Sequence, residues 1–175
     1  MNLLKGQNIF LRALEPEDSI ILYDWENDPE VWKVSNTLVP FSKHLLEQYV
    51  NSAQDIYLTK QLRFMICLEK KPIGTIDLFD FEPFHQRAGI GIIIADKSQR
   101  QKGYASEAID LLVEYCFSHL LLHQLYCNIQ LSNEASMKVF LEKSFNVIGV
   151  KKDWNRTNDG FDDEYLLQLI NYNDY

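Results

Sequence analysis

Short apolar runs alternate with amphipathic segments along the whole chain. Residues 9–14 and 62–68 are rich in branched and aromatic side chains, a composition that predicts strands. Two further runs, 73–81 and 88–95, follow turns that contain proline, so the middle of the chain predicts a meander of three strands. The segment 90–94 is apolar on both faces, as in a strand at the centre of a sheet.

Helical spacing of apolar residues marks the segments around these strands. Proline and acids at residues 15–18 start a helix that ends near Asp28, and Ser42 is suited to cap a second helix. The longest helical pattern covers residues 104–118, with one apolar face and one acidic face. Another helix is expected to begin at a cap in residues 132–133 and to end near residue 143.

The second half of the chain returns to strand patterns. One strand is expected at residues 125–129, and two more at 145–150 and 165–170, with a turn at 158–160 in the long connection between them. A loop and a helix separate the strands at 90–94 and 125–129, so these two form a crossover unit and should be parallel. The helical first third of the chain is suited to form a lid or a substrate wall over the sheet.

Composition narrows the class of protein. The chain has 175 residues, which fits one domain over residues 1–175, and 46% hydrophobic residues indicate a globular fold. No apolar run approaches the roughly 20 residues of a membrane span, so no membrane partner is expected. Three cysteines, an odd number in apolar settings without metal-ligand spacing, predict reduced thiols in the cytoplasm and no metal site.

The net charge of −8 limits the choice of ligand. It argues against general binding of nucleic acid and suits a cationic substrate. An equally good interpretation is that the charge keeps the protein in solution.

The stretch from Gln99 to Ala105 joins an apolar strand to the longest predicted helix. Backbone N–H groups at a helix N-terminus attract anions, and Gly103 allows a phosphate to approach the backbone closely. Arg100 and Lys102 add positive charge. The alternative interpretation is an ordinary connection that contains a glycine.

The pattern Arg100-x-x-Gly103-x-Ala105, in this order of elements, resembles the GCN5-related N-acetyltransferase (GNAT) superfamily and its acetyl-CoA motif Gln/Arg-x-x-Gly-x-Gly/Ala. The segments 11–18 and 85–88 resemble the branch of ribosomal-protein N-terminal and spermidine/diamine acetyltransferases. The resemblance covers nearly the whole chain. It implies an α/β (α+β) GNAT fold, in which a mixed, mostly antiparallel sheet contains a splayed parallel strand pair and carries helices on both faces.

The resemblance also implies that acetyl-CoA is the acetyl donor. The loop would hold its pyrophosphate, the strand backbone at residues 92–94 would pair with its pantetheine arm, and that strand would splay from the strand at 126–128. Asn133 and Ser136 match the helix beside the arm; a plain N-cap is the other role for Asn133, and the two roles are compatible. The implied cofactor-binding residues are Ile92, Ile93, Ile94, Arg100, Gln101, Lys102, Gly103, Tyr104, Ala105, Asn133 and Ser136.

The implied reaction is acetyl transfer to a primary amine, with a polyamine or diamine such as spermidine as the first expectation. Many GNAT enzymes protonate the leaving thiolate with a tyrosine seven residues after the asparagine, and this position is Phe140 here. Ser136 is the first substitute and Tyr126 the second; the simpler interpretations are a helix-end hydroxyl for Ser136 and a core tyrosine for Tyr126. Acetylation of a protein N-terminus, or weak turnover by an acyl-CoA-binding module, is the alternative function.

Polyamine-acetylating members tend to carry a glutamate where this chain has Gly89. Other acidic residues could form an acidic entrance that binds the amine, although acidic residues on loops often have no role beyond contact with solvent. The candidate substrate-binding residues are Glu26, Asp28, Asp77, Asp80 and Glu82. The family also suggests a homo-oligomer, either a dimer or a larger assembly.

Overall fold

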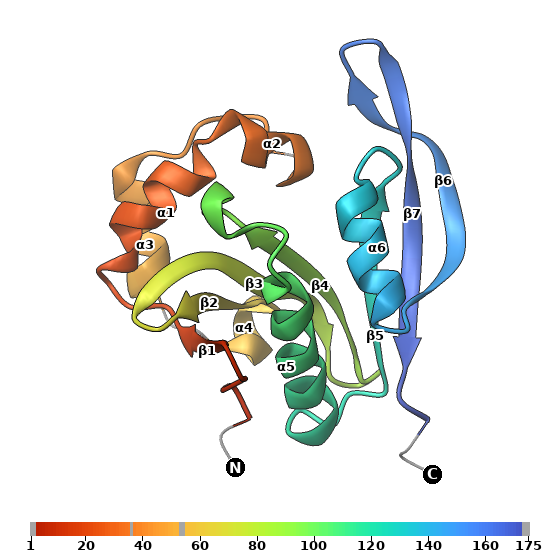
Figure 1. Cartoon of the computed structure of the whole chain (residues 1–175), viewed down its shortest axis with the longest axis horizontal. Coiled ribbons are helices and arrows are strands. Elements are labelled where there is room, and N and C mark those ends of the chain that lie inside the picture. Colours follow the sequence, from red (N-terminus) through yellow and green to blue (C-terminus); the bar gives the residue numbers. More distant parts are fainter. Residues whose placement is uncertain (1–2, 36, 53–54, 173–175) are drawn as a thin grey trace.

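A computed structural model describes residues 3–35, 37–52 and 55–172 (Figure 1). One sheet holds β1 (Ile9–Ala13), β2 (Leu62–Leu68), β3 (Lys71–Glu82), β4 (Arg87–Ile94), β5 (Gln124–Gln130), β6 (Asn146–Thr157) and β7 (Gly160–Ile170). Its strand order is β1-β2-β3-β4-β5-β7-β6. Only the β4–β5 pair is parallel among the described strands, and every other neighbouring pair is antiparallel. The expected mixed, mostly antiparallel sheet with one parallel pair is confirmed.

Six α-helices surround this sheet in the described part of the chain. They are α1 (Asp18–Glu26), α2 (Pro29–Ser35), α3 (Lys43–Asn51), α4 (Ile56–Thr59), α5 (Tyr104–Ser118) and α6 (Glu134–Glu142). Figure 1 shows α1, α2 and α3 gathered at one end of the sheet and the β6–β7 hairpin at the other. The helices predicted around Ser42 and Asn133 begin at those caps, because each side chain accepts a backbone N–H of the first turn.

Side-chain alternation divides the core into two clusters. On one face of the sheet, Ile76 and Leu78 of β3 and Leu125 of β5 pack with Ile109 and Leu112 of α5. On the other face, α1 and α3 enclose a smaller cluster over β2, which contains Leu14, Leu22, Leu46, Val50, Met65 and Cys67. Because successive residues of a strand point to opposite faces, Asp77 and Phe79 lie on the face away from α5.

The last two strands are longer than their apolar patterns predicted. β6 has 12 residues and β7 has 11, and a tight turn at residues 158–159 joins them. Residues 151–157 are mostly polar, so hydrophobic alternation did not identify them, yet backbone pairing inside the hairpin continues almost to its tip. Short α4 also lacked a clear signal in the sequence.

Within residues 3–35, 37–52 and 55–172, no helix has the length and apolar character needed to cross a membrane. The same ranges contain no group of three or more His, Cys, Asp or Glu side chains arranged to hold a metal ion.

Candidate active site

The parallel strands β4 and β5 separate after a short paired segment. Residues 87–89 pair with residues 124–126, and no further ladder pair joins the two strands in the described structure. β5 continues to pair with β7 as far as Gln130, while β4 continues to pair only with β3. The edge of β4 over residues 90–94 therefore has backbone groups without a strand partner, which an extended ligand can bind.

A cavity of about 840 Å³ opens on the face of the sheet away from α5; we call it the main cavity. Helices α1 to α3 contribute one wall, β2 to β4 the floor, and β5 to β7 the opposite wall. Its charged and amide side chains are Glu26, Gln61, Arg63, Asp77, Asn128, Gln130, Asn133, Lys151 and Glu164. Its larger apolar and aromatic side chains include Leu22, Trp25, Phe41, Tyr49, Phe79, Ile92, Ile93 and Trp154.

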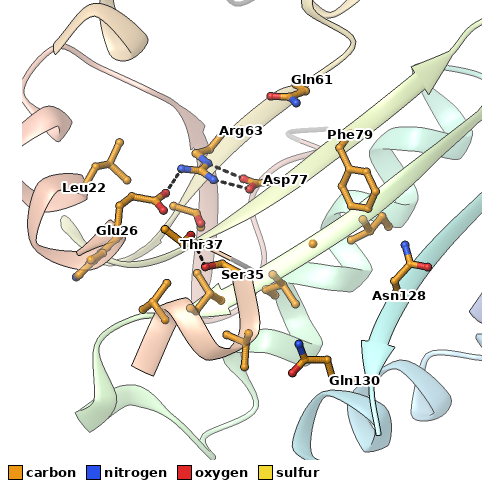
Figure 2. A pocket seen from close by; sticks show the side chains of 18 of the residues that line it. Leu22, Glu26, Ser35, Thr37, Gln61, Arg63, Asp77, Phe79, Asn128 and Gln130 are labelled. Carbon is orange, nitrogen blue, oxygen red and sulfur yellow. Dashed lines mark hydrogen bonds and ion pairs between the residues drawn. The ribbon is translucent and has the colours of Figure 1, made fainter. Parts of the chain in front are cut away.

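Arg63 of β2 holds two carboxylates of the main cavity in place (Figure 2). Its Nε and Nη2 donate to the two carboxylate oxygens of Asp77 at 2.9 and 2.7 Å, and its Nη1 donates to Glu26. Its guanidinium carbon lies 5.6 Å from the centre of the Tyr49 ring, a cation–π distance. Burial lowers the pKa of Arg63, but the charge and hydrogen bonds of Asp77 outweigh burial and raise it, so the guanidinium stays charged.

The opposite wall carries a second ion pair. Lys151 of β6 donates to Glu164 of β7 at 2.8 Å and to Asn128 of β5 at 2.9 Å, and Asn155 also donates to Glu164. The β6–β7 register shifts between Lys151 and Asn155, and Trp154 from this irregular segment lines the cavity. Together the two ion-pair clusters contain three carboxylates and two cations, so the lining has a net charge of −1.

The loop at residues 99–105 leads into the N-terminus of α5. Gly103 has φ +86° and forms the N-cap of α5, without a side chain to cap the helix. A Cβ at Gly103 would meet nothing within 4 Å, so the space above this turn is open. The first N–H groups of a helix have no partner inside the helix, and they carry the positive end of its dipole.

Ion pairs connect this loop and the short 3-10 helix before it (Lys97–Gln99) to the helices that form one wall of the main cavity. Lys97 lies 3.3 Å from Asp28 and 3.5 Å from Glu30, and Arg100 lies 3.8 Å from Glu30. Arg100 also donates from Nε to the carbonyl of Ile94 at 2.9 Å. The expected substrate acid Asp28 therefore lies at the junction of α1 and α2 beside Lys97, outside the main cavity.

The start of α6 lies next to the gap between the strands. Asn133 caps α6, because its Oδ1 accepts the Ser136 N–H at 3.2 Å, and Asn133 also lines the main cavity. Ser136 is half-buried, and its hydroxyl has no hydrogen bond to any residue that the structure describes. Phe140 is 2% exposed, and its ring meets the Phe145 ring edge to face, with the ring centroids 5.1 Å apart. The position of the usual tyrosine is thus part of the core.

Tyr126 lines a second cavity. This cavity, of about 600 Å³, is lined by Asp80, Glu82 and Tyr126, among others, and none of these three lines the main cavity. The Tyr126 hydroxyl donates to Asp80 at 2.9 Å. Burial, followed by this hydrogen bond and the charge of Asp80, raises the pKa of Tyr126 to about 12. Tyr126 is therefore neutral at physiological pH, and its proton is already shared with Asp80.

The structure brings together part of the set predicted from the sequence. Glu26, Asp77, Ile92, Ile93 and Asn133 share the main cavity, while Asp28, Asp80, Glu82, Tyr126 and Ser136 lie outside its lining.

Sequence reasoning missed the cations that neutralise the acids of the main cavity. Arg63 carried a usable signal, because a single charge inside the apolar run 62–68 predicts a buried ion pair. Lys151 and Glu164 carried no such signal, since they lie in polar stretches of the long hairpin.

Comparisons with known proteins agree with this geometry. The family model for the acetyltransferase (GNAT) domain matches residues 8–144. The probable N-acetyltransferase YjcK of Bacillus subtilis (strain 168) is 32% identical over 193 aligned positions, covering 98% of this chain and 99% of the relative. The spermidine N(1)-acetyltransferase of Escherichia coli (strain K12) is 26% identical over 148 positions, covering 82% of this chain and 76% of the relative.

A solved structure shows the same fold. The crystal structure of spermidine N-acetyltransferase from Vibrio cholerae in complex with CoA and spermine superposes with a TM-score of 0.85 at 24% identity, covering 94% of this chain and 96% of that one. The domain match runs from just before β1 to just beyond α6 and includes the separated strands and the loop before α5. On this evidence the chain belongs to the GNAT family of acetyltransferases.

Proposed function

We propose that this N-acetyltransferase acetylates a small primary amine bound in the main cavity. The observation that carries the proposal is the position of the cavity relative to the gap between β4 and β5. Ile92 and Ile93 on one side of the gap, and Asn128 on the other, also line the main cavity. A donor held in the gap and an amine held in the cavity would therefore meet at this point.

GNAT enzymes use acetyl-CoA, and the residues of this chain fit it. The edge of β4 at Ile92 and Ile93 is available to pair with an extended pantetheine arm, and Asn133 lines the same cavity. The proposed pairing ends at Ile94, whose carbonyl accepts from Arg100. The open turn at Gly103 leaves room for a pyrophosphate, which the backbone N–H groups of Gln101, Lys102, Gly103, Tyr104 and Ala105 would hold. The Arg100 N–H already donates to the Lys97 carbonyl at 3.4 Å, so Arg100 would contribute its side-chain charge. When bound, acetyl-CoA supplies an acetyl group activated as a thioester.

The main cavity has to bind the amine and let it lose a proton. An amine of pKa about 10.4 costs roughly 4.6 kcal/mol to deprotonate at pH 7. The net −1 charge of the lining favours entry of the ammonium form, and its proton leaves to water or to a carboxylate before attack. As the new N–C bond forms and the C–S bond breaks, one proton leaves the nitrogen and one proton reaches the thiolate sulfur.

Ser136 is our proposed source of the thiolate proton. Phe140 is a buried hydrocarbon side chain and has no proton to give. The Tyr126 hydroxyl already donates its proton to Asp80. The Ser136 hydroxyl, one turn from Asn133 and free of other described partners, remains available, and its partial exposure lets solvent replace the proton.

The acceptor class rests on the relatives and on the shape of the cavity. A spermidine acetyltransferase among the relatives supports a small amine, with polyamines as the first case to test. A protein N-terminus remains the alternative, which would need an open groove for its backbone.

The cysteines Cys67, Cys116 and Cys127 are buried and unpaired, which supports the cytoplasm as the site of this reaction.

A thiol-release assay with acetyl-CoA tests this function. The amine panel contains spermidine, spermine, putrescine, 2-phenylethylamine, an aminoglycoside and short peptides with free N-termini. We expect turnover with at least one small amine and slower release with the peptides. Binding of acetyl-CoA without release of thiol for any amine would contradict the proposal and favour an acyl-CoA-binding module.

A further inference from the structure

An aromatic ring occupies the sheet surface where β4 and β5 separate. Phe79 of β3 is the cross-strand neighbour of Gly89 of β4, and its ring lies directly over that glycine. A Cβ placed on Gly89 would lie only 2.2 Å from Cε2 of Phe79 and 2.4 Å from its Cζ. The φ angle of Gly89 lies outside the left-handed region, so the backbone would accept other residues. Glycine is required here because the ring needs the space.

The ring reaches across β4 to β5. Its Cε1 lies 3.8 Å from the Cβ position of Gly91, and its edge contacts the ring of Tyr126 with centroids 5.7 Å apart. Gly89 and Tyr126 form the last ladder pair of β4 and β5. Phe79 is only half-buried and lines the main cavity, where Figure 2 shows it on the same side as Asn128. An apolar surface thus faces the point at which donor and amine would meet.

The charges of the main cavity suit one positive charge and no more. Glu26 and Asp77 are both bound by Arg63, and Glu164 is bound by Lys151 and Asn155. No carboxylate of the described lining is without a cationic partner. The net charge of −1 can balance one ammonium group. A second or third ammonium group would lose water and make the net charge of the cavity positive, which is costly.

The wall formed by α1 to α3 also carries apolar and aromatic side chains. Leu22 and Trp25 of α1, Tyr49 of α3 and Phe41 just before α3 line the main cavity. An amine that points its nitrogen at the strand gap would place its carbon skeleton between this wall and Phe79, where burial of apolar surface favours binding.

We propose that the acceptor is a primary amine with a single positive charge and an aromatic or apolar body, and that Phe79, seated on Gly89, selects it. This proposal rests on the proposed function and narrows its substrate class. Phe79 acts as a specificity residue that contacts the body of the amine. The bond changes at the amine nitrogen and at the thioester are those given for the proposed reaction.

The test compares 2-phenylethylamine with spermidine in three variants. We expect the wild type to acetylate 2-phenylethylamine with the higher kcat/KM. Phe79→Ala should lower kcat/KM for this amine about tenfold or more and change it little for spermidine, because only the aromatic amine loses a contact. The double variant Phe79→Ala/Gly89→Glu removes the clashing ring atoms and adds a carboxylate, so spermidine should become the better substrate. Phe84→Ala, at a residue that is 86% exposed, is the matched control and should leave both amines unchanged.

Two outcomes would overturn the proposal. One is a wild-type preference for spermidine, and the other is an equal loss for both amines in Phe79→Ala, which would indicate a purely structural role. Calorimetry of 2-phenylethylamine with the CoA-loaded protein separates this proposal from the proposed function. If no amine releases thiol, the proposed function fails; if 2-phenylethylamine binds the wild type and Phe79→Ala with equal affinity, or binds neither, the selection by Phe79 fails.

Discussion

The 99–105 loop and the main cavity are neighbouring parts of the candidate active site, but they are built in different ways. The loop is seven consecutive residues, from the end of a short 3-10 helix (Lys97–Gln99) into the first turn of α5, and the groups proposed to bind CoA are its backbone N–H groups. The main cavity takes its side chains from α1 to α3 and from β2 to β7. Its central ion pairs join Arg63 to Asp77, 14 positions away, and to Glu26, 37 positions away. A backbone site is encoded locally, whereas a side-chain site depends on the complete fold.

This difference predicts that substitutions in the two regions have separate effects, on CoA affinity for the loop and on stability for the main cavity. Substitutions in the loop should reduce affinity for CoA and leave the cavity folded, because no residue of the loop lines the main cavity. Damage to the ion pairs of the cavity should reduce stability and leave the loop intact. Four substitutions test this separation.

The largest effect is expected for Arg63→Met. It leaves Glu26 and Asp77 without their cation in a partly buried place, since the Arg63 side chain is 20% exposed. We expect a loss of roughly 3 kcal/mol in the free energy of unfolding, measured in urea. The triple variant Arg63→Met/Glu26→Gln/Asp77→Asn should recover much of that loss, because no charge is left unpaired. Equal stability of Arg63→Met and the wild type would show that the network is not structural.

Gly103→Glu should weaken CoA binding about 100-fold, or about 2.7 kcal/mol. Only glycine adopts φ +86° without strain, and the new carboxylate would enter the space proposed for the pyrophosphate. Calorimetry measures the affinity, and urea unfolding checks that the fold is kept. Gly103→Ala is the control, because it adds strain without charge and should lose less affinity. An unchanged affinity in Gly103→Glu would remove the loop from the CoA site.

Ser136→Ala should lower kcat for acetyl transfer about 100-fold, at the lower end of the range for loss of a general acid. The alanine keeps the backbone N–H that Asn133 caps, so α6 and CoA affinity should stay near normal. Ser132→Ala is the control, because its hydroxyl is bonded to Asp162 outside the main cavity. Equal rates in wild type and Ser136→Ala would exclude this serine as the donor.

The smallest effect is expected for Glu30→Gln, at the connection between the two regions. Glu30 lies near Lys97 and Arg100, so it competes with any phosphate for these cations. Removing its charge should tighten CoA binding two- to threefold at low salt, and less at high salt, because exposed pairs are weak and screened. Glu47→Gln on α3 removes the same charge at an exposed site and should have no effect. Equal affinities for Glu30→Gln and Glu47→Gln would mean that Glu30 does not compete.

Patterns within the sequence predicted most of the fold correctly. Apolar alternation located the meander, and the order strand, loop, helix, strand required a parallel pair, which β4 and β5 form. Capping residues located the starts of α3 and α6. Local patterns failed in the β6–β7 hairpin, because its polar outer half is held by backbone pairing and gives no hydrophobic signal.

The candidate site was less predictable than the fold. Asp80 and Tyr126 were sensible candidates by residue type, but the fold pairs them with each other beside the second cavity. The sequence showed that Gly89 departs from the pattern of polyamine-acetylating members, but it did not show why a glycine is needed there. That reason is the Phe79 ring, which comes from the neighbouring strand ten positions earlier in the chain.

The sequence by itself determined the features that depend on consecutive residues. These are the glycine turn before α5, the helix caps and the crossover that makes β4 and β5 parallel, because each follows from local backbone geometry. Only the tertiary structure decided which charges remain free and which surface the amine meets. Arg63 neutralises acids from two other elements, and Phe79 covers a neighbouring strand. Contacts between distant segments set the charge and shape of a cavity, and such contacts exist only once the sheet has formed.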